Sequence, residues 1–185
     1  MPVSDLYTVP GFRVGVRPPT HADVEASADA IRRSDHIARW NPSDPDDLPN
    51  LIRLQGEGFR TFLVVDTADL GLAGRINASN IVHGRFRNAS LGYDAYKPYV
   101  GTGRMTEALA LVIDRAFAPD GLDLHRLEIN VQPDNEVSIA LARRMGFRHE
   151  GYTPRMLFLN EAWRDHERFA LTAEEWRGAV EILPS

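Results

Sequence analysis

The 185-residue chain contains no cysteine, and this absence removes several kinds of chemistry at once. Without thiols the chain has no disulfide framework, no thiolate zinc site and no cysteine nucleophile. The six histidines are scattered, and no two of them have the i, i+4 spacing of a helical metal site. We therefore expect no metal cofactor.

Long apolar runs are missing as well. No stretch approaches the ~18 consecutive apolar residues that cross a bilayer. Residues 1–10 lack the basic start and apolar run of a signal peptide. We expect a cytoplasmic protein with no membrane partner, in which residues 1–10 form a flexible or peripheral segment.

The overall charge carries no excess of basic groups. A net charge of −5 and a sequence pI near 5.7 argue against a face that binds nucleic acid, although they leave room for a local basic pocket. With 43% hydrophobic residues, the chain can bury one sizeable core. We expect a single domain over residues 1–185.

The pattern of apolar residues predicts an α/β domain with one mixed, mostly antiparallel sheet and helices on its faces. Period-2 alternation and β-branched runs indicate strands. Spacings near 3.6 residues indicate amphipathic helices. The expected strands are residues 12–17, 62–65, 72–82, 89–96, 127–131, 147–150, 156–159 and 165–171. The expected helices are residues 21–34, 48–57, 103–117 and 135–145, with a proline-rich loop at 41–50.

A strand, a glycine loop and a helix follow one another in residues 91–117. Gly101 and Gly103 immediately precede the helix, so backbone N–H groups can turn toward an anion there, and the helix N-terminus adds a partial positive charge. Arg104 and Lys97 are candidates to add side-chain charge. Taken alone, this spacing also fits an ordinary tight turn.

Two standard phosphate loops are excluded by residue type. A Walker loop needs lysine followed by serine or threonine after the last glycine, where this chain has Arg104 and Met105. A dinucleotide fingerprint needs a further glycine where Thr106 stands. The antiparallel character of the early strands also argues against a doubly wound dehydrogenase.

A second group of polar residues is Glu128, Asn130, Asn135 and Ser138. Asn135 and Ser138 are i, i+3 at a helix start and share one face. Glu128 and Asn130 point from one face of the preceding strand. These residues can converge with the glycine loop at one cleft. They also fit structural roles, with Asn135 as a helix cap, Ser138 on the surface and Glu128 paired to a nearby arginine.

Several segments, in this order, carry a resemblance to a known family: residues 92–93, 99–108, 125–128, 133–138 and 145–147. Together they resemble the GNAT acetyltransferase superfamily. Residues 151–152, 157–160 and 163–166 are similar to its RimJ/RimL branch, the ribosomal-protein-alanine N-acetyltransferases and their relatives. The resemblance is good over residues 72–172, whereas the N-terminal third matches by strand–helix order only.

The resemblance implies a sheet of six or seven strands whose fourth and fifth, near residues 89–96 and 124–131, splay apart around acetyl-coenzyme A. The pyrophosphate would meet the loop amides, and the pantetheine would run along the fourth strand. The cofactor-binding residues that it implies are Tyr93, Val100, Gly101, Thr102, Gly103, Arg104, Met105, Thr106, Asn135 and Ser138.

The chain departs from the superfamily pattern at Val100 and Met105, which contribute mainly backbone amides, and at Ala142. The tyrosine that serves as general acid in many GNAT enzymes would fall at Ala142, which cannot donate a proton. The resemblance therefore implies that Ser138 protonates the departing thiolate.

An α-amine has a pKa near ~7.7–8.0, so its acetylation needs modest help from a base. The resemblance makes Glu128 our first candidate, because the equivalent strand position in some N-terminal acetyltransferases carries a glutamate in that role. His125 and Asp94 are further candidates. A backbone N–H near Tyr93–Asp94 would stabilise the oxyanion.

Three functions remain possible, which differ in whether and to what the acetyl group is transferred. The chain can acetylate a protein N-terminal amine, acetylate a small amine such as an antibiotic, polyamine or amino acid, or hold acyl-coenzyme A without turnover. Trp40 and the loop 41–50 are expected to border the acceptor site, where Asp44, Asp46 and Asp47 would attract a cationic amine. Because relatives often dimerise, we expect a homodimer.

Overall fold

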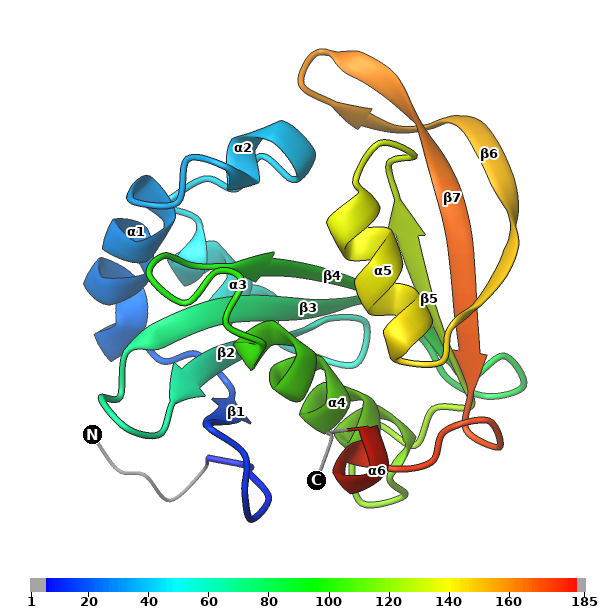
Figure 1. The fold of residues 1–185 in the computed structure, drawn as a ribbon, viewed down its shortest axis with the longest axis horizontal. Helices are drawn as coiled ribbons and strands as arrows, with labels where there is room; N and C mark the ends of the chain where they lie inside the picture. The colour runs from blue at the N-terminus through cyan, green and yellow to red at the C-terminus, as the bar shows by residue number, and fades with distance from the viewer. Residues whose placement is uncertain (1–5, 183–185) are drawn as a thin grey trace.

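Seven strands form one sheet in the computed structural model, which describes residues 6–182 (Figure 1). Their order across the sheet is β1-β2-β3-β4-β5-β7-β6. The strands are β1 (Val14–Arg17), β2 (Arg60–Asp66), β3 (Leu72–Val82), β4 (Asn88–Ala95), β5 (Arg126–Val131), β6 (Arg148–Leu159) and β7 (Ala162–Thr172). The helices are α1 (Val24–Arg32), α2 (Ile37–Trp40), α3 (Leu48–Leu54), α4 (Arg104–Phe117), α5 (Glu136–Arg144) and α6 (Ala179–Ile182), and the 3-10 turn η2 (His21–Asp23) precedes α1.

The pairing between β4 and β5 differs from every other pairing in the described sheet, because it is parallel. It covers only three register pairs and ends at Ser90↔Glu128. Beyond that point residues 91–95 of β4 and 129–131 of β5 separate, as Figure 1 shows. The expected mixed, mostly antiparallel sheet with splayed fourth and fifth strands is thus confirmed.

Helices cover both faces of the sheet, and alternation along β2 shows why. Leu63 packs with Leu48 and Leu51 of α3, whereas the next residue, Val64, joins the larger core under α4. Helix α4 is apolar almost all round, so it is buried between β1–β3 and α6. Its fully buried residues include Leu109, Leu111, Val112, Ile113 and Ala116.

One buried carboxylate fixes the start of α4 against β1. Glu107 accepts hydrogen bonds from the backbone N–H of Arg13 at 2.6 Å and from its Nε at 2.7 Å. Because Glu107 is only 3% exposed, these charge-assisted bonds form in a poorly screened environment. They hold the N-terminus of α4 in place, which matters for the loop before it.

Some expectations from the sequence need correction. Residues 147–150 and 156–159, expected as two strands, belong to one long strand, because β6 continues through them and absorbs the irregularity in two register shifts. Helices α2 and α6 were not predicted. The expectation for residues 1–10 falls partly on 1–5, outside the described residues, while Tyr7 pairs with Val16. Among residues 6–182, no helix has both the length and the apolar character needed to span a bilayer.

Candidate functional site

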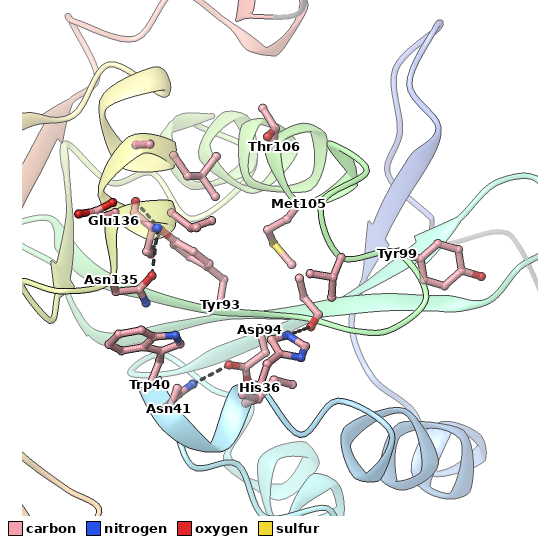
Figure 2. Close-up of a pocket in the computed structure, with 18 of the residues that line it drawn as sticks. His36, Trp40, Asn41, Tyr93, Asp94, Tyr99, Met105, Thr106, Asn135 and Glu136 are labelled. Atoms are coloured by element: carbon pink, nitrogen blue, oxygen red, sulfur yellow. Dashed lines mark hydrogen bonds between the residues drawn. The ribbon is translucent and has the colours of Figure 1, made fainter.

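A cleft of about 740 Å³ opens where β4 and β5 separate (Figure 2). The N-terminus of α4 and the length of α5 form one wall, and helix α2 with Trp40 forms another. Figure 2 shows Tyr93 and Met105 pointing into it from β4 and α4. The backbone of residues 91–95 has no partner strand on this side, so its polar groups are open to a ligand except the Ala95 carbonyl, which lies 3.1 Å from His36 Nε2.

The glycine loop lies at the mouth of the cleft. Gly101 has φ 76° and Gly103 has φ 85°, a left-handed conformation that other residues rarely adopt. The N–H groups of Gly103, Arg104, Met105 and Thr106 donate to no acceptor within residues 6–182. Four free donors and the positive end of a 14-residue helix make a strong site for an anion.

The charged side chains in and near this loop contact other residues and do not point to the expected anion site. The Arg104 guanidinium pairs with buried Asp66 and stacks over the Tyr99 ring, 5.2 Å from its centre. The Lys97 ammonium lies 2.7 Å from Asp35. The expected supplement of charge from Arg104 and Lys97 is therefore committed elsewhere.

Thr102 also turns inward on its own loop. Its hydroxyl and its N–H both donate to the carbonyl of Tyr99. Neither Thr102 nor Arg104 lines the cleft, whereas Val100, Gly101, Gly103, Met105 and Thr106 do. Arg104 can offer a ligand only its backbone N–H, and Thr102 offers none.

Two hydroxyl groups meet at the floor of the cleft. The Tyr93 oxygen lies 2.6 Å from Ser138 Oγ, and burial raises the pKa of Tyr93 to about 12, so the phenol keeps its proton. Asn135 caps α5, because its Oδ1 accepts from the Ser138 N–H at 3.2 Å. The capping role left open by the sequence is therefore present, and Asn135 lines the cleft as well.

The position expected for a general-acid tyrosine cannot serve. Ala142 is fully buried, packs in the main core and lines neither cavity. The hydroxyl of Tyr93 was missed as an acid, since the sequence assigned Tyr93 only to cofactor binding. Its contact with Ser138 spans 45 residues and depends on the tertiary fold.

A second cavity of about 450 Å³ lies beside the first. The two share lining residues: Trp40, Asn41, Tyr93, Asn135 and Ser138. The second cavity is bounded by β3, β4, β5 and the β6–β7 hairpin. Two ligands can thus approach each other from separate cavities, with the hydroxyl pair between them.

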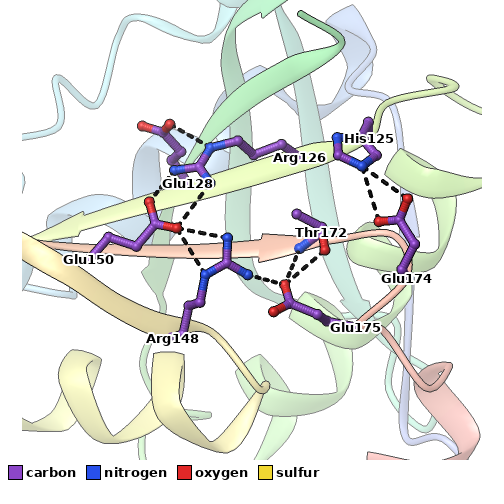
Figure 3. Close-up of polar contacts among 8 residues, drawn as sticks. All are labelled: His125, Arg126, Glu128, Arg148, Glu150, Thr172, Glu174 and Glu175. Atoms are coloured by element: carbon purple, nitrogen blue, oxygen red, sulfur yellow. Dashed lines mark hydrogen bonds and ion pairs between the residues drawn. The ribbon is translucent and has the colours of Figure 1, made fainter.

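Glu128, the first base candidate, lines the second cavity but is not free. Its Oε1 accepts from Arg126 Nε at 2.9 Å, and Arg126 also binds Glu150 (Figure 3). Arg148 extends this network from Glu150 toward the end of β7. The pairing with a nearby arginine, left open by the sequence, is what the structure has.

The other two base candidates, Asp94 and His125, are already paired with neighbouring side chains. Asp94 is buried and accepts from Asn41 and Ser43 at 2.9 Å and from Arg75 at 3.2 Å. His125 lies 3.0 Å from Glu174 and lines neither cavity. The Asp94 carboxylate is thus already occupied by three donors.

The acidic loop also differs from expectation. Asp44, Asp46 and Asp47 line neither cavity, and Asp46 pairs with Arg32 at 2.7 Å. These acids therefore do not contact either cavity, and their attraction of a cationic amine stays a prediction. Trp40 and Asn41, by contrast, border both cavities as expected.

Two histidines that the sequence did not single out also line the cavities. His36 lines the first, where its Nε2 lies 3.1 Å from the Ala95 carbonyl. His166 lines the second and is 2% exposed. The alternation of β7 places His166 on one face, but only the sheet order shows that this face borders a cavity.

Comparisons with known proteins agree with this geometry. A family model described as an acetyltransferase (GNAT) domain matches residues 13–148. The ribosomal protein uS5-alanine N-acetyltransferase of Escherichia coli (strain K12) is 35% identical over 127 residues, which are 69% of this chain. The match covers 64% of that relative, less than two thirds of its length.

Solved structures match over more of the chain. Mycobacterium smegmatis RimJ in complex with CoA-disulfide has 31% sequence identity and a TM-score of 0.83, over 96% of this chain and 91% of that one. A ribosomal-protein-S5-alanine acetyltransferase from Vibrio fischeri has 27% identity and a TM-score of 0.79, over 93% and 98%.

Proposed function

The chain belongs to the GNAT acetyltransferase family, in its RimJ/RimL-like branch, and from this premise we propose that it transfers an acetyl group from acetyl-coenzyme A to a primary amine. The observation that carries the proposal is the row of free N–H groups at the start of α4. These donors open onto a cleft beside an unpaired strand edge and meet a second cavity at Tyr93 and Ser138.

Acetyl-coenzyme A fits the first cleft by its chemistry. Its pyrophosphate is the anion that the N–H groups of residues 103–106 require. The amide groups of its pantetheine arm match the open backbone edge of residues 91–95. The thioester then lies near Tyr93, Asn135 and Ser138, which line this cleft. RimJ of Mycobacterium smegmatis is named as a complex with CoA-disulfide, which supports the assignment.

The hydroxyl pair supplies the acid. As the amine nitrogen bonds to the acetyl carbon and the C–S bond breaks, the Ser138 hydroxyl donates its proton to the departing sulfur. Tyr93, which stays protonated at neutral pH, donates in turn to Ser138 Oγ. A backbone N–H near Tyr93–Asp94, at the open edge of β4, stabilises the oxyanion.

The acceptor that we propose is a protein N-terminal amine. The curated relative is named for acetylation of an alanine of ribosomal protein uS5. The second cavity also favours a peptide, because carboxamides line it at Asn77, Asn80 and Asn130 and its one carboxylate, Glu128, is already paired to arginine. Such neutral groups suit a peptide backbone better than a polycation.

Residues 1–185 act in this proposal as one domain, since the main core joins Phe12 near the start to Ala179 near the end. We further propose that the protein is cytoplasmic, acts without nucleic acid and forms a homodimer. Analytical ultracentrifugation tests the oligomeric state, and a monomer at micromolar concentration would refute the dimer.

The function is tested by release of free thiol from acetyl-coenzyme A. We expect release with a short peptide that starts with alanine, and none with the same peptide acetylated at its N-terminus. Spermidine in place of the peptide distinguishes a small-amine enzyme. Cofactor binding without thiol release from any amine would leave a non-catalytic acyl-coenzyme A binder, and absence of cofactor binding would overturn the proposal.

Variants assign the acid within the same assay. Ser138→Ala should lower kcat about 10²-fold, the low end of the range for general acids, with cofactor affinity nearly unchanged. Tyr93→Phe should lower kcat by a smaller factor. Tyr7→Phe removes a phenol that lines neither cavity and serves as the matched control. Full activity in Ser138→Ala would remove Ser138 from the mechanism.

A further inference from the structure

His166 on β7 has its ring orientation and tautomer fixed by the backbone. Its Nδ1 lies 3.0 Å from the carbonyl oxygen of Arg164. A carbonyl can only accept, so Nδ1 carries the hydrogen, and the neutral ring holds its lone pair at Nε2. Nε2 has no partner among residues 6–182.

This lone pair belongs to the second cavity. His166 lines that cavity together with Tyr93 and Ser138. Asn130 of β5 lies opposite Arg168, and alternation places Arg168 and His166 on the same face of β7. Asn130 therefore shares the face of His166.

Asn130 adds a second unpaired acceptor. Its Oδ1 is buried and receives no hydrogen bond from any described residue. A buried acceptor without a donor is destabilising, so a ligand that supplies a donor is favoured there. Asn130 and His166 line the same cavity, and a primary ammonium, which has three N–H groups, has enough donors for Asn130 Oδ1 and His166 Nε2.

We propose that His166 is the general base of the acetyl transfer, with Asn130 Oδ1 holding a second N–H of the acceptor ammonium. The inference rests on the proposed acetyltransferase function. The N–H bond of the ammonium breaks and its proton goes to Nε2. The freed electron pair of nitrogen then attacks the thioester carbonyl. As the C–S bond breaks, the hydroxyl pair of Ser138 and Tyr93 gives one proton to sulfur and takes up the second proton that the nitrogen loses. The imidazolium returns its proton to solvent after transfer.

The charged groups that bear on His166 are Asp165, its neighbour on β7, Arg168, which shares its face of β7, and Glu128 of β5, which lines the same cavity. Burial lowers the pKa of His166 and outweighs the attraction of the Asp165 carboxylate. The ring is thus neutral at pH 7 and able to accept a proton. Glu128, in the same cavity, favours the imidazolium that forms.

A base that accepts from an ammonium leaves a distinct pH profile. The productive species combine neutral His166 with a protonated amine, so kcat/KM stays flat between the pKa of His166 and that of the amine, near ~8. Without the base only the free amine reacts. The value of kcat/KM then rises about tenfold per pH unit up to that same amine pKa.

The test uses His166→Asn with the alanine-starting peptide as acceptor. Asparagine keeps a donor near the Arg164 carbonyl and removes the Nε2 base. We expect kcat/KM at pH 7 to fall about 10²-fold and the flat region to become the rising line. His125→Asn, outside both cavities, is the matched control and should keep the wild-type profile.

Other outcomes would overturn the inference. A uniform fall with an unchanged flat region would make His166 a structural residue. His166→Gln provides a second variant, and coenzyme A affinity with thermal unfolding verifies that each variant is folded. If both variants fail to fold, titration of the His166 ring in the wild-type protein decides the inference.

Nitrogen-15 NMR spectra measure the pKa of the His166 ring and do not require catalytic turnover. In wild type saturated with coenzyme A, the alanine-starting peptide should lower the pKa of His166, because an ammonium beside Nε2 disfavours its protonation. No change would refute the amine site. A shift in a protein that releases no thiol would retain the amine site, while the proposed function and the base role would both fail.

Discussion

Replacement of Asp94 by alanine tests whether this carboxylate is a structural hub or an available base. Asp94 accepts from Asn41, Ser43 and Arg75, and it thereby ties the loop after α2 to β4 and β3. The side chains of Arg75 and Asp94 are 5% and 3% exposed. The pair is therefore screened little by solvent.

The expected loss of stability comes from the Arg75 charge that the substitution leaves unpaired. Removing one partner of a buried ion pair costs about 3–5 kcal/mol, because the other charge is left uncompensated. Arg75 tolerates this poorly, since its Nε and Nη1 already lack partners among the described residues. We expect Asp94→Ala to lose about 4 kcal/mol, which lowers Tm by about 8–16 °C for a chain of this length.

Urea and thermal unfolding measure the loss. Asp134→Ala is the matched control, because Asp134 pairs with Arg39 at 3.3 Å while both side chains are more than 65% exposed. Such a pair is worth about 1 kcal/mol or less. If Asp94→Ala lost no more stability than this control, the buried-pair reasoning would fail, and Asp94 would return as a candidate base.

Two further predictions concern the loop and the ion network. Gly103→Asp should abolish detectable coenzyme A binding in calorimetry, because its Cβ would stand 3.0 Å from Arg13 Nη2 in a left-handed backbone and its carboxylate would repel the pyrophosphate. Glu150→Gln should lower the free energy of unfolding by about 1–2 kcal/mol at pH 7, discounted because a quarter of the side chain is exposed. Arg126 and Arg148 lower the pKa of Glu150 from 4.5 to about 2, so this stability is present above pH 4.5 and lost as the pH falls toward 2.

Matched controls accompany both. Gly58→Asp places the same side chain where a Cβ meets nothing within 4 Å and should bind coenzyme A normally. Glu57→Gln, an exposed position, should leave the acid transition of wild type intact. Near-normal affinity in Gly103→Asp would show an ordinary turn. An identical acid transition in Glu150→Gln and wild type would contradict the network argument.

The fold was largely predictable because its signals are local. Alternation indicated most strands, and the 3.6-residue period indicated α1, α4 and α5. The long strand β6 was missed because Gly151 and Pro154 look like strand breakers. In the structure, register shifts after His149 and Thr153 let the strand continue past both.

The site was predictable where it depends on backbone and not where it depends on partners. The loop at Gly101 and Gly103 was identified by spacing and by the family resemblance. The direction of Arg104 was not, because its partner Asp66 lies 38 residues earlier. His166 was not predicted for a similar reason. Strand β7 lies between β5 and β6 in the sheet, an order that cannot be read from the sequence.

The irregular strand β6 also limits how copies of this protein can meet. It is an outermost strand of the sheet, and such edges tend to pair with another chain. Two bulges, Pro154 and a left-handed Arg155 interrupt its line of backbone donors. These features disfavour continuous pairing of β6 with a strand of another molecule, so contacts between copies along this edge would rely on side chains.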